Sequence, residues 1–185
     1  MAGEPTFDEM LDTMKRAAAA LQRAEIPFML GGGLAVWAYG GPETEHDVDF
    51  MLLEADAPRA QEALVEAGMK PEDPPENWLL KAYDGEVLVD LIFCSSAGPI
   101  TVEMIERAEE RSVQSMRLKV SSLEDVLVQK LLVINEQQPD YTSVLELSRS
   151  VREQIDWEDV RERTKHSAFA AAFFTLIEQL DVLPA

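Results

Sequence analysis

The spacing of hydrophobic and polar positions changes along the chain. Up to about residue 120, short apolar runs typical of strands alternate with segments in which apolar residues recur every three to four positions, as in helices. Beyond that point the periodic segments all have the helical spacing. The pattern therefore predicts an α/β (α+β) fold, with a small mixed sheet flanked by helices in residues 1–120 and a helical subdomain in residues 121–185.

Capping and turn residues predict where these elements begin and end. Thr6 and Glu9 form a capping-box pattern before the first helix, and residues 121–124 repeat it. Asp56 is expected to cap a further helix, and the dipeptide Asp84-Gly85 between two apolar runs predicts a hairpin. The predicted helices are 6–25, 34–39, 56–68, 101–111, 121–135, 141–153, 157–164 and 168–180; the predicted strands are 28–30, 48–53, 78–83, 86–93 and 115–120, with a proline-rich loop at 71–77.

Composition limits the classes of protein to which the chain can belong. Hydrophobic residues make up 46% of the 185 residues, and the formal net charge is −19. This acidity argues against a broad interface with a nucleic-acid backbone. No apolar run approaches the roughly 20 residues of a membrane span and no signal-peptide pattern is present, so no membrane contact is expected. Cys94 is the single cysteine, which makes a reducing cytoplasm the expected location.

Three aspartates lie inside apolar runs. Asp47 and Asp49 are separated by one residue in a predicted strand, so their side chains point to the same face. Asp90 is the only charged residue in the apolar run 87–93, and a buried carboxylate is costly unless it is paired or binds a metal. If the two strands are neighbours, three carboxylates converge, and their mutual repulsion favours bound cations.

A glycine triplet, residues 31–33, separates the first predicted strand from a short helix. Glycines at such a turn leave room for a phosphate to approach backbone N–H groups. The alternative is a tight strand-to-helix turn without a ligand. Together with the aspartates, the triplet indicates a site for a metal-bound nucleoside triphosphate.

These residues resemble the nucleotidyltransferase superfamily with the polymerase-beta-type core. The resemblance rests on Gly32-Gly33, thirteen intervening residues, Asp47-Val-Asp49 and the strand-borne Asp90. More narrowly, the chain resembles small bacterial nucleotidyltransferases that include abortive-infection-type toxins and aminoglycoside-modifying enzymes. The segment 120–132 is similar to their C-terminal helical part.

The resemblance implies a role for each matching residue. Gly32 and Gly33 would bound the triphosphate, and Lys130 would reach the phosphates, although a surface lysine is the alternative. Asp47, Asp49 and Asp90 would be the catalytic carboxylates that hold Mg²⁺ or Mn²⁺, and Asp90 would help to activate the acceptor hydroxyl. The implied reaction transfers a nucleoside monophosphate from an NTP such as ATP to an acceptor, with release of pyrophosphate.

The acceptor stays open at this stage. The resemblance to toxins implies an RNA such as tRNA, or a protein, and an antitoxin partner, whereas the resemblance to aminoglycoside enzymes implies a small molecule. The acidity favours a cationic acceptor, with Glu43, Glu45 and Glu54 as a possible surface for it. Trp78, at the start of the hairpin, is a candidate for lining an acceptor groove.

One departure from the family pattern supports a different class of function. Many relatives carry an arginine and a threonine where this chain has Glu43 and Glu45, and two acids near a triphosphate would repel it. The alternatives to an enzyme are therefore a catalytically degenerate nucleotidyltransferase that binds a nucleotide or a protein, and a plain interaction domain.

Overall fold

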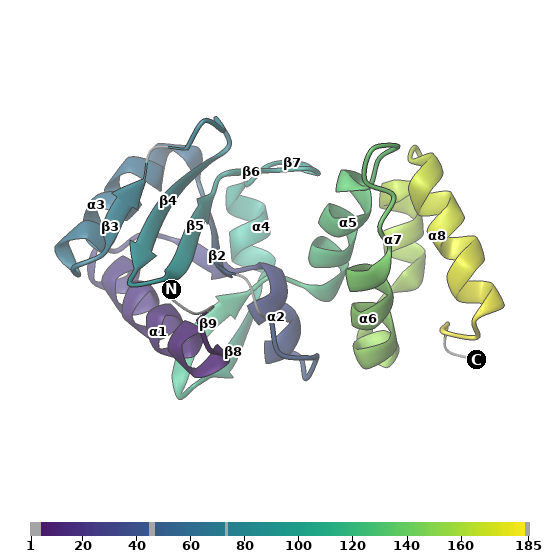
Figure 1. Cartoon of the computed structure of the whole chain (residues 1–185), viewed down its shortest axis with the longest axis horizontal. Coiled ribbons are helices and arrows are strands. Elements are labelled where there is room, and N and C mark those ends of the chain that lie inside the picture. The colour runs from purple at the N-terminus through teal and green to yellow at the C-terminus, as the bar shows by residue number, and fades with distance from the viewer. Residues whose placement is uncertain (1–4, 45–46, 73, 184–185) are drawn as a thin grey trace.

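The computed structural model describes residues 5–44, 47–72 and 74–183. In this part of the chain a seven-stranded mixed sheet has the order β3-β4-β5-β2-β1-β9-β8, which confirms the predicted fold class (Figure 1). The strands are β1 (Phe28–Leu30), β2 (Asp47–Leu52), β3 (Lys70–Glu72), β4 (Leu79–Asp84), β5 (Val87–Ile92), β8 (Glu109–Val113) and β9 (Met116–Val120), and a separate hairpin joins β6 (Cys94–Ser95) to β7 (Gly98–Pro99).

Strand β2 lies in the middle of the sheet and alternates between two environments. Val48, Phe50 and Leu52 are buried in the main hydrophobic core. Asp47, Asp49 and Met51 point to the opposite face. β5 runs parallel to β2, and Asp49 is level with Asp90 in their register. The two strands predicted to carry the carboxylates are therefore neighbours.

Helices α1 (Phe7–Arg23) and α3 (Ala57–Glu66) cover one face of the sheet (Figure 1). α1 is amphipathic and buries Met10, Met14 and Leu21. Its predicted capping box is present, because the Thr6 hydroxyl accepts from the Glu9 N–H and the Glu9 carboxylate accepts from the Thr6 N–H.

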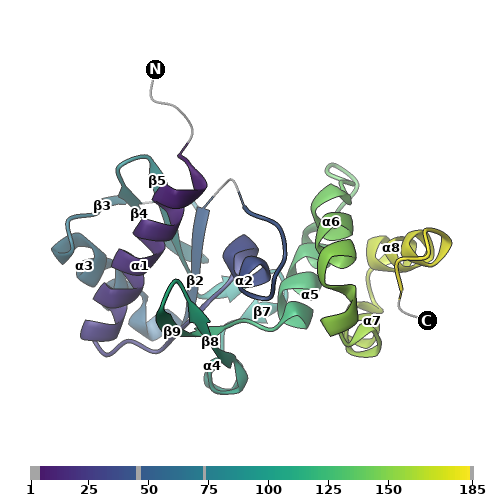
Figure 2. The ribbon, with the colours of Figure 1, turned by 90° about the horizontal axis from the view of Figure 1, so that it is seen from below.

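The other face carries α2 (Gly32–Ala38) and α4 (Val102–Arg107). The last part of the chain forms α5 (Leu123–Val133), α6 (Thr142–Val151), α7 (Trp157–Thr164) and α8 (Ala168–Gln179), which pack together at one end of the molecule with α2 between them and the sheet (Figure 2). The boundary predicted between residues 120 and 121 falls in the connection from β9 to α5 and stays a prediction about domains.

Three predicted boundaries are wrong. The helix expected over 101–111 ends at Arg107, and Glu109 begins the exposed edge strand β8, which turns into β9 at Gln114 and Ser115 with positive φ angles of 49° and 65°. The expected loop 71–77 begins inside edge strand β3, where a proline is tolerated. Helix α2 begins at Gly32, two residues before the predicted start at 34.

Asp56 is the N-cap residue of α3, as predicted, but its side chain does not cap the helix. Asp56 lies in a 3₁₀ turn, η1 (Glu54–Asp56), and makes no side-chain cap hydrogen bond. Its carboxylate instead accepts from Arg59 at 3.0 Å.

As for membranes, none of the helices in the described ranges combines the length and the apolar character that a crossing requires.

Candidate active site

Asp47, Asp49 and Asp90 converge at the centre of the sheet. Each offers a carboxylate oxygen, and these three oxygens lie within 4.8 Å of one another. The parallel pairing of β2 with β5 produces this arrangement, because it brings Asp90 level with Asp49 on the same face. Asp47 and Asp49 are half-buried, and Asp90 is buried.

The convergence makes ionisation of Asp49 and Asp90 unfavourable. Burial raises the pKa of Asp49 well above its usual range, the charges of Asp47 and Asp90 raise it further, and Lys130 opposes the shift. Burial and the charge of Asp47 raise the pKa of Asp90 to about 6, against the opposing charge of Lys81. Lys81 is directly opposite Asp90 in the register of β4 with β5.

The donor set fits a divalent cation. Carboxylate oxygens are the hard ligands that Mg²⁺ and Mn²⁺ take in proteins. Oδ1 of Asp90 is buried and has no hydrogen-bond partner among the described residues. A buried acceptor without a donor is costly, and a cation between the three carboxylates would remove that cost.

Two glycines make close packing around Asp49 possible. Gly32 has a φ of +54°, and a β-carbon there would lie 1.7 Å from Oδ2 of Asp49. A β-carbon on Gly33 would lie 2.4 Å from the Thr44 hydroxyl. The backbone also ties this turn to β2, because the Gly31 N–H donates to the carbonyl of Asp49 at 2.9 Å. The glycine pattern therefore has a packing role that the sequence did not reveal.

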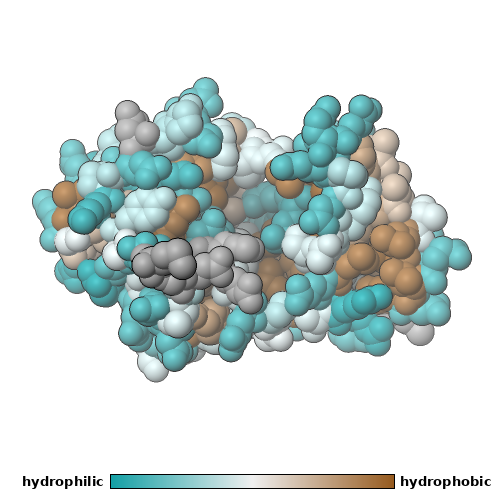
Figure 3. All heavy atoms as spheres, viewed as in Figure 1, coloured by the Kyte–Doolittle hydropathy of each residue, from teal (hydrophilic) through white to brown (hydrophobic). Residues whose placement is uncertain are grey.

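Lys130, on α5, lines a cavity together with Asp49, and its charge lowers the pKa of that carboxyl. It lines three cavities, two of which border the glycine turn. One, of about 610 Å³, lies between the sheet, the β6–β7 hairpin and α5, and includes Asp49 and Gly32. The other, of about 270 Å³, lies between α2 and α6 and includes Gly33. Figure 3 shows the surface hollowed between the sheet and the C-terminal helices.

Of the two acids in the predicted turn, Glu43 and Glu45, the structure describes Glu43 alone. Glu43 lines the smaller cavity together with Thr44 and Glu146, so an acid does lie near Gly33. Glu45 lies outside the described residues. Glu54 is placed in the 3₁₀ turn η1 and lines neither of these two cavities.

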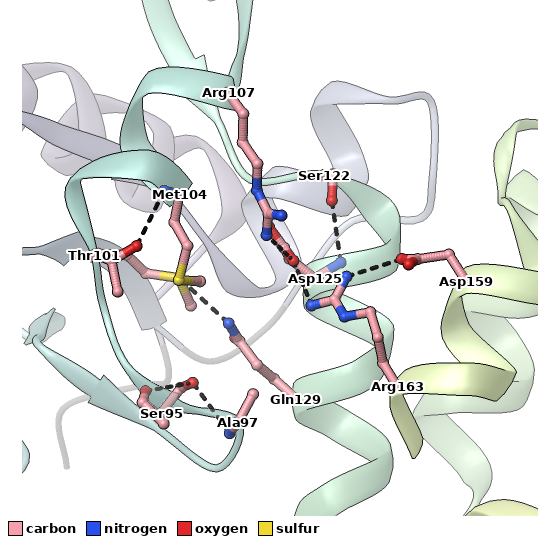
Figure 4. Close-up of polar contacts among 12 residues, drawn as sticks. Ser95, Ala97, Thr101, Met104, Arg107, Ser122, Asp125, Gln129, Asp159 and Arg163 are labelled. Atoms are coloured by element: carbon pink, nitrogen blue, oxygen red, sulfur yellow. Dashed lines mark hydrogen bonds and ion pairs between the residues drawn. The ribbon is translucent and has the colours of Figure 1, made fainter. Parts of the chain in front are cut away.

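A buried ion-pair cluster holds α5 in place, and sequence reasoning missed it. Asp125 is 2% exposed and accepts from Arg107 of α4 at 2.7 and 2.9 Å, and from Arg163 of α7 at 2.6 Å (Figure 4). Arg163 also donates to Asp159 at 3.0 Å, and the Asp125 N–H donates to the hydroxyl of Ser122. The only sequence signal for Asp125 is its place in the first turn of a capped helix, which is ordinary for an acid.

Comparisons with known proteins agree with this fold. A family model described as a nucleotidyl transferase of unknown function (DUF2204) matches residues 10–169. No curated protein matches the chain. The solution structure of the antibiotic-resistance factor ANT(2'')-Ia is similar with a TM-score of 0.68 at 17% identity, covering 95% of this chain and 99% of that one.

Two crystal structures extend the likeness. ANT(2'')-Ia in complex with adenylyl-2''-tobramycin has a TM-score of 0.65 at 18% identity, covering 88% of this chain and 98% of that one. The lincosamide antibiotic adenylyltransferase LnuA, bound to lincomycin, has a TM-score of 0.53 at 12% identity, covering 83% and 97%. At such identities the likeness shows a shared fold. The family match goes further: the chain belongs to the family of nucleotidyl transferases of unknown function and is a nucleotidyltransferase.

Proposed function

We propose that the protein transfers a nucleoside monophosphate from an NTP to a hydroxyl of a small-molecule acceptor and releases pyrophosphate, with Mg²⁺ or Mn²⁺ held by Asp47, Asp49 and Asp90. One observation carries the proposal: three carboxylate oxygens on two parallel strands lie within 4.8 Å of one another. Such a cluster suits the clamp of cations that stabilises the attacking and leaving oxygens of an in-line displacement.

Each residue of the site would have its own role. Asp47, Asp49 and Asp90 would hold the cations, which supply positive charge to the phosphates and to the attacking oxygen. Gly32 and Gly33 would bound the triphosphate, and Lys130 would contact it. This assignment is supported by the cavities, since Lys130 lines one with Gly32 and the other with Gly33.

The bonds made and broken balance within the two substrates. The acceptor oxygen forms a bond to the α-phosphorus, and the bond from that phosphorus to the oxygen bridging to the β-phosphate breaks. The electron pair of the broken bond leaves with pyrophosphate. The carboxylate of Asp90 takes the proton of the acceptor hydroxyl, as a base positioned beside the attacking atom.

A small-molecule acceptor is supported by the structural neighbours, whose names link them to tobramycin and to lincosamides. An RNA or protein acceptor, with a toxin role and an antitoxin partner, stays a prediction from the sequence, as does a location in the cytoplasm. The binding module without turnover is favoured by one observation, the presence of Glu43 in the cavity beside Gly33.

Label transfer tests the proposal. The full chain would be incubated with Mg²⁺ or Mn²⁺, each of the four α-labelled NTPs in turn, and a bacterial lysate. We expect a labelled product that resists RNase and protease, and none with Asp49→Ala. Asp12→Ala, which removes an exposed carboxylate of α1, is the matched control and should behave as the wild type.

Each other outcome has a distinct meaning. A product sensitive to RNase or to protease would show that the acceptor is RNA or protein and not a small molecule. Equal labelling by wild type and Asp49→Ala would disprove the catalytic role of the carboxylates. Binding of MgATP without labelled product in any lysate fraction would favour the binding module.

A further inference from the structure

We propose that the larger cavity, of about 610 Å³, is the acceptor site, and that it selects an uncharged, largely apolar compound that carries a hydroxyl group. The inference rests on the proposed function and adds the chemical class of the acceptor. It is drawn from where the cavity lies, from the character of its walls and from the placement of charge around it.

The position of the cavity suits an acceptor. Met51 and Ile92 line it, and each follows a carboxylate of the cluster by two residues on the same strand face. The cavity therefore continues directly from Asp49 and Asp90 along the sheet. A hydroxyl group on a compound bound there would reach the carboxylate cluster, where its oxygen must attack.

The walls are mostly apolar. Val126 and Val133 of α5 face Met51 and Ile92 of the sheet across the cavity. Trp78 forms one edge and is 41% exposed, so part of its ring is free to stack on a flat group. An apolar enclosure with a few polar groups is typical of small-molecule sites.

The walls are also fixed to one another across the cavity. The carbonyl of Trp78 accepts from the N–H groups of Phe93 and Cys94 at 3.1 and 3.2 Å. The Ser96 hydroxyl donates to the carbonyl of Gln129 at 2.7 Å, and the Gln129 amide contacts the sulfur of Met51 at 3.8 Å. A pre-formed site of this kind loses little conformational entropy when it binds a ligand.

The larger and the smaller cavity differ in the charged residues that line them. Among the described residues that line the larger cavity, Asp49 and Lys130 are the charged ones, and the remaining polar groups are neutral. Two glutamates, Glu43 and Glu146, line the smaller cavity instead. The net charge of −19 is therefore not concentrated on the walls of the larger cavity, which lack the several carboxylates that a polycation requires.

The hydrogen-bond donors, and not the carboxylates, indicate which substrate lies on which side. Gly33 and Thr44 line the smaller cavity with Lys130, so donors for phosphate oxygens gather there. The attacking and leaving oxygens lie roughly in line on opposite sides of the phosphorus. A triphosphate on the Gly33 side therefore leaves the larger cavity to the acceptor.

Calorimetric titration of the full chain tests this assignment. The probes are 2-(2-naphthyl)ethanol, as an uncharged aromatic alcohol, and tobramycin, as a polycation, each added with and without MgATP. We expect the alcohol to bind and tobramycin not to bind. Trp78→Ala and Val133→Asp should each weaken binding of the alcohol at least tenfold, and MgATP should not displace it.

A matched control keeps the result interpretable. Val133 and Val65 each lie at or next to the last residue of a helix, are 58% and 43% exposed, and only Val133 lines the cavity. Val65→Asp should therefore leave binding of the alcohol unchanged. Stabilisation by MgATP, measured by thermal unfolding, should be the same in all three variants as in the wild type.

The outcomes separate this inference from the proposed function. Absence of binding by the alcohol, equal affinity in all variants, or binding of tobramycin in its place would overturn the inference. Displacement of the alcohol by MgATP would assign the cavity to the nucleobase. Absence of any stabilisation by MgATP in the wild type would instead count against the proposed function.

Discussion

The carboxylate of Asp49 occupies the space that a side chain on Gly32 would need. A β-carbon at residue 32 would lie 1.7 Å from Oδ2 of Asp49, far inside van der Waals contact. The residue that resembles a phosphate-binding glycine is thus also required for the position of a candidate metal ligand. This relationship leads to the first prediction.

Gly32→Ala should displace Asp49 and reduce transfer about 100-fold, as expected for misplacement of a catalytic group by roughly 1 Å. Gly85→Ala is the matched control, because Gly85 also has a positive φ, +64°, but nothing lies within 4 Å of its β-carbon position. Both variants place a side chain at a positive φ, which costs about 1–2 kcal/mol. Only Gly32→Ala should lose activity in a steady-state assay, and equal loss in both would contradict the clash.

Asp90→Asn should stabilise the metal-free protein at neutral pH. Because the pKa of Asp90 is raised to about 6 in the folded state, its ionisation opposes folding above the unfolded pKa of about 4. The destabilisation therefore grows as the pH rises from about 4 to about 6, and is complete above that range. Between pH 4 and pH 7 the free energy of unfolding of the wild type should fall by on the order of 1–3 kcal/mol relative to that of Asp90→Asn. Thermal unfolding in EDTA measures this difference.

Mg²⁺ should stabilise the wild type, because it binds the folded carboxylate cluster and not the unfolded chain. At a concentration 100 times the dissociation constant the gain is about 2.7 kcal/mol. Asp49→Asn and Asp90→Asn should lose this gain, and EDTA should reverse it in the wild type. A shift of the same size in all three proteins would show that Mg²⁺ binds elsewhere.

Lys130→Ala should weaken binding of the donor NTP and leave binding of the metal unchanged. Loss of one charged contact to a phosphate is expected to raise the KM for MgATP about tenfold. Stabilisation by Mg²⁺ alone should remain, and Lys130→Arg should recover part of the KM. An unchanged KM would show that Lys130 is a surface lysine that does not contact the phosphates.

Asp125→Ala should be strongly destabilising, by about 3 kcal/mol, because it leaves the half-buried Arg163 without its main partner. Arg107→Gln removes the more exposed partner, 56% accessible, and should cost about 1 kcal/mol or less. Urea unfolding of both variants measures the difference. Comparable losses would show that Arg107 contributes as much to the cluster as Arg163.

The sequence predicts the convergence of the carboxylates because the relevant signals are local. The Asp47-Val-Asp49 spacing places two side chains on one face, and an acid inside an apolar strand marks Asp90 as unusual. The hairpin turn at Asp84-Gly85 then places Asp90 on a strand of the sheet. Only the neighbouring position of β2 and β5 required the structure.

The features that could not be predicted depend on contacts between distant segments. Nothing in the sequence around Asp125 indicates that Arg107 and Arg163 meet there, since an acid in the first turn of a helix is common. The wrong helix over 101–111 has a similar origin. Glu109 and Arg111 lie on an exposed edge strand whose pairing with β9 outweighs local propensity.

The register of β2 with β5 couples folding to chemistry. A slip of one residue would turn Asp90 towards the main core and bring Val89 or Leu91 out beside Asp49, so the apolar residues that demand burial also select the catalytic alignment. The pairing joins segments about forty residues apart, so we expect it to form after the local helices and the hairpin. Metal affinity should therefore appear in refolding only once β2 and β5 have paired in register, which makes it a direct kinetic reporter of that pairing.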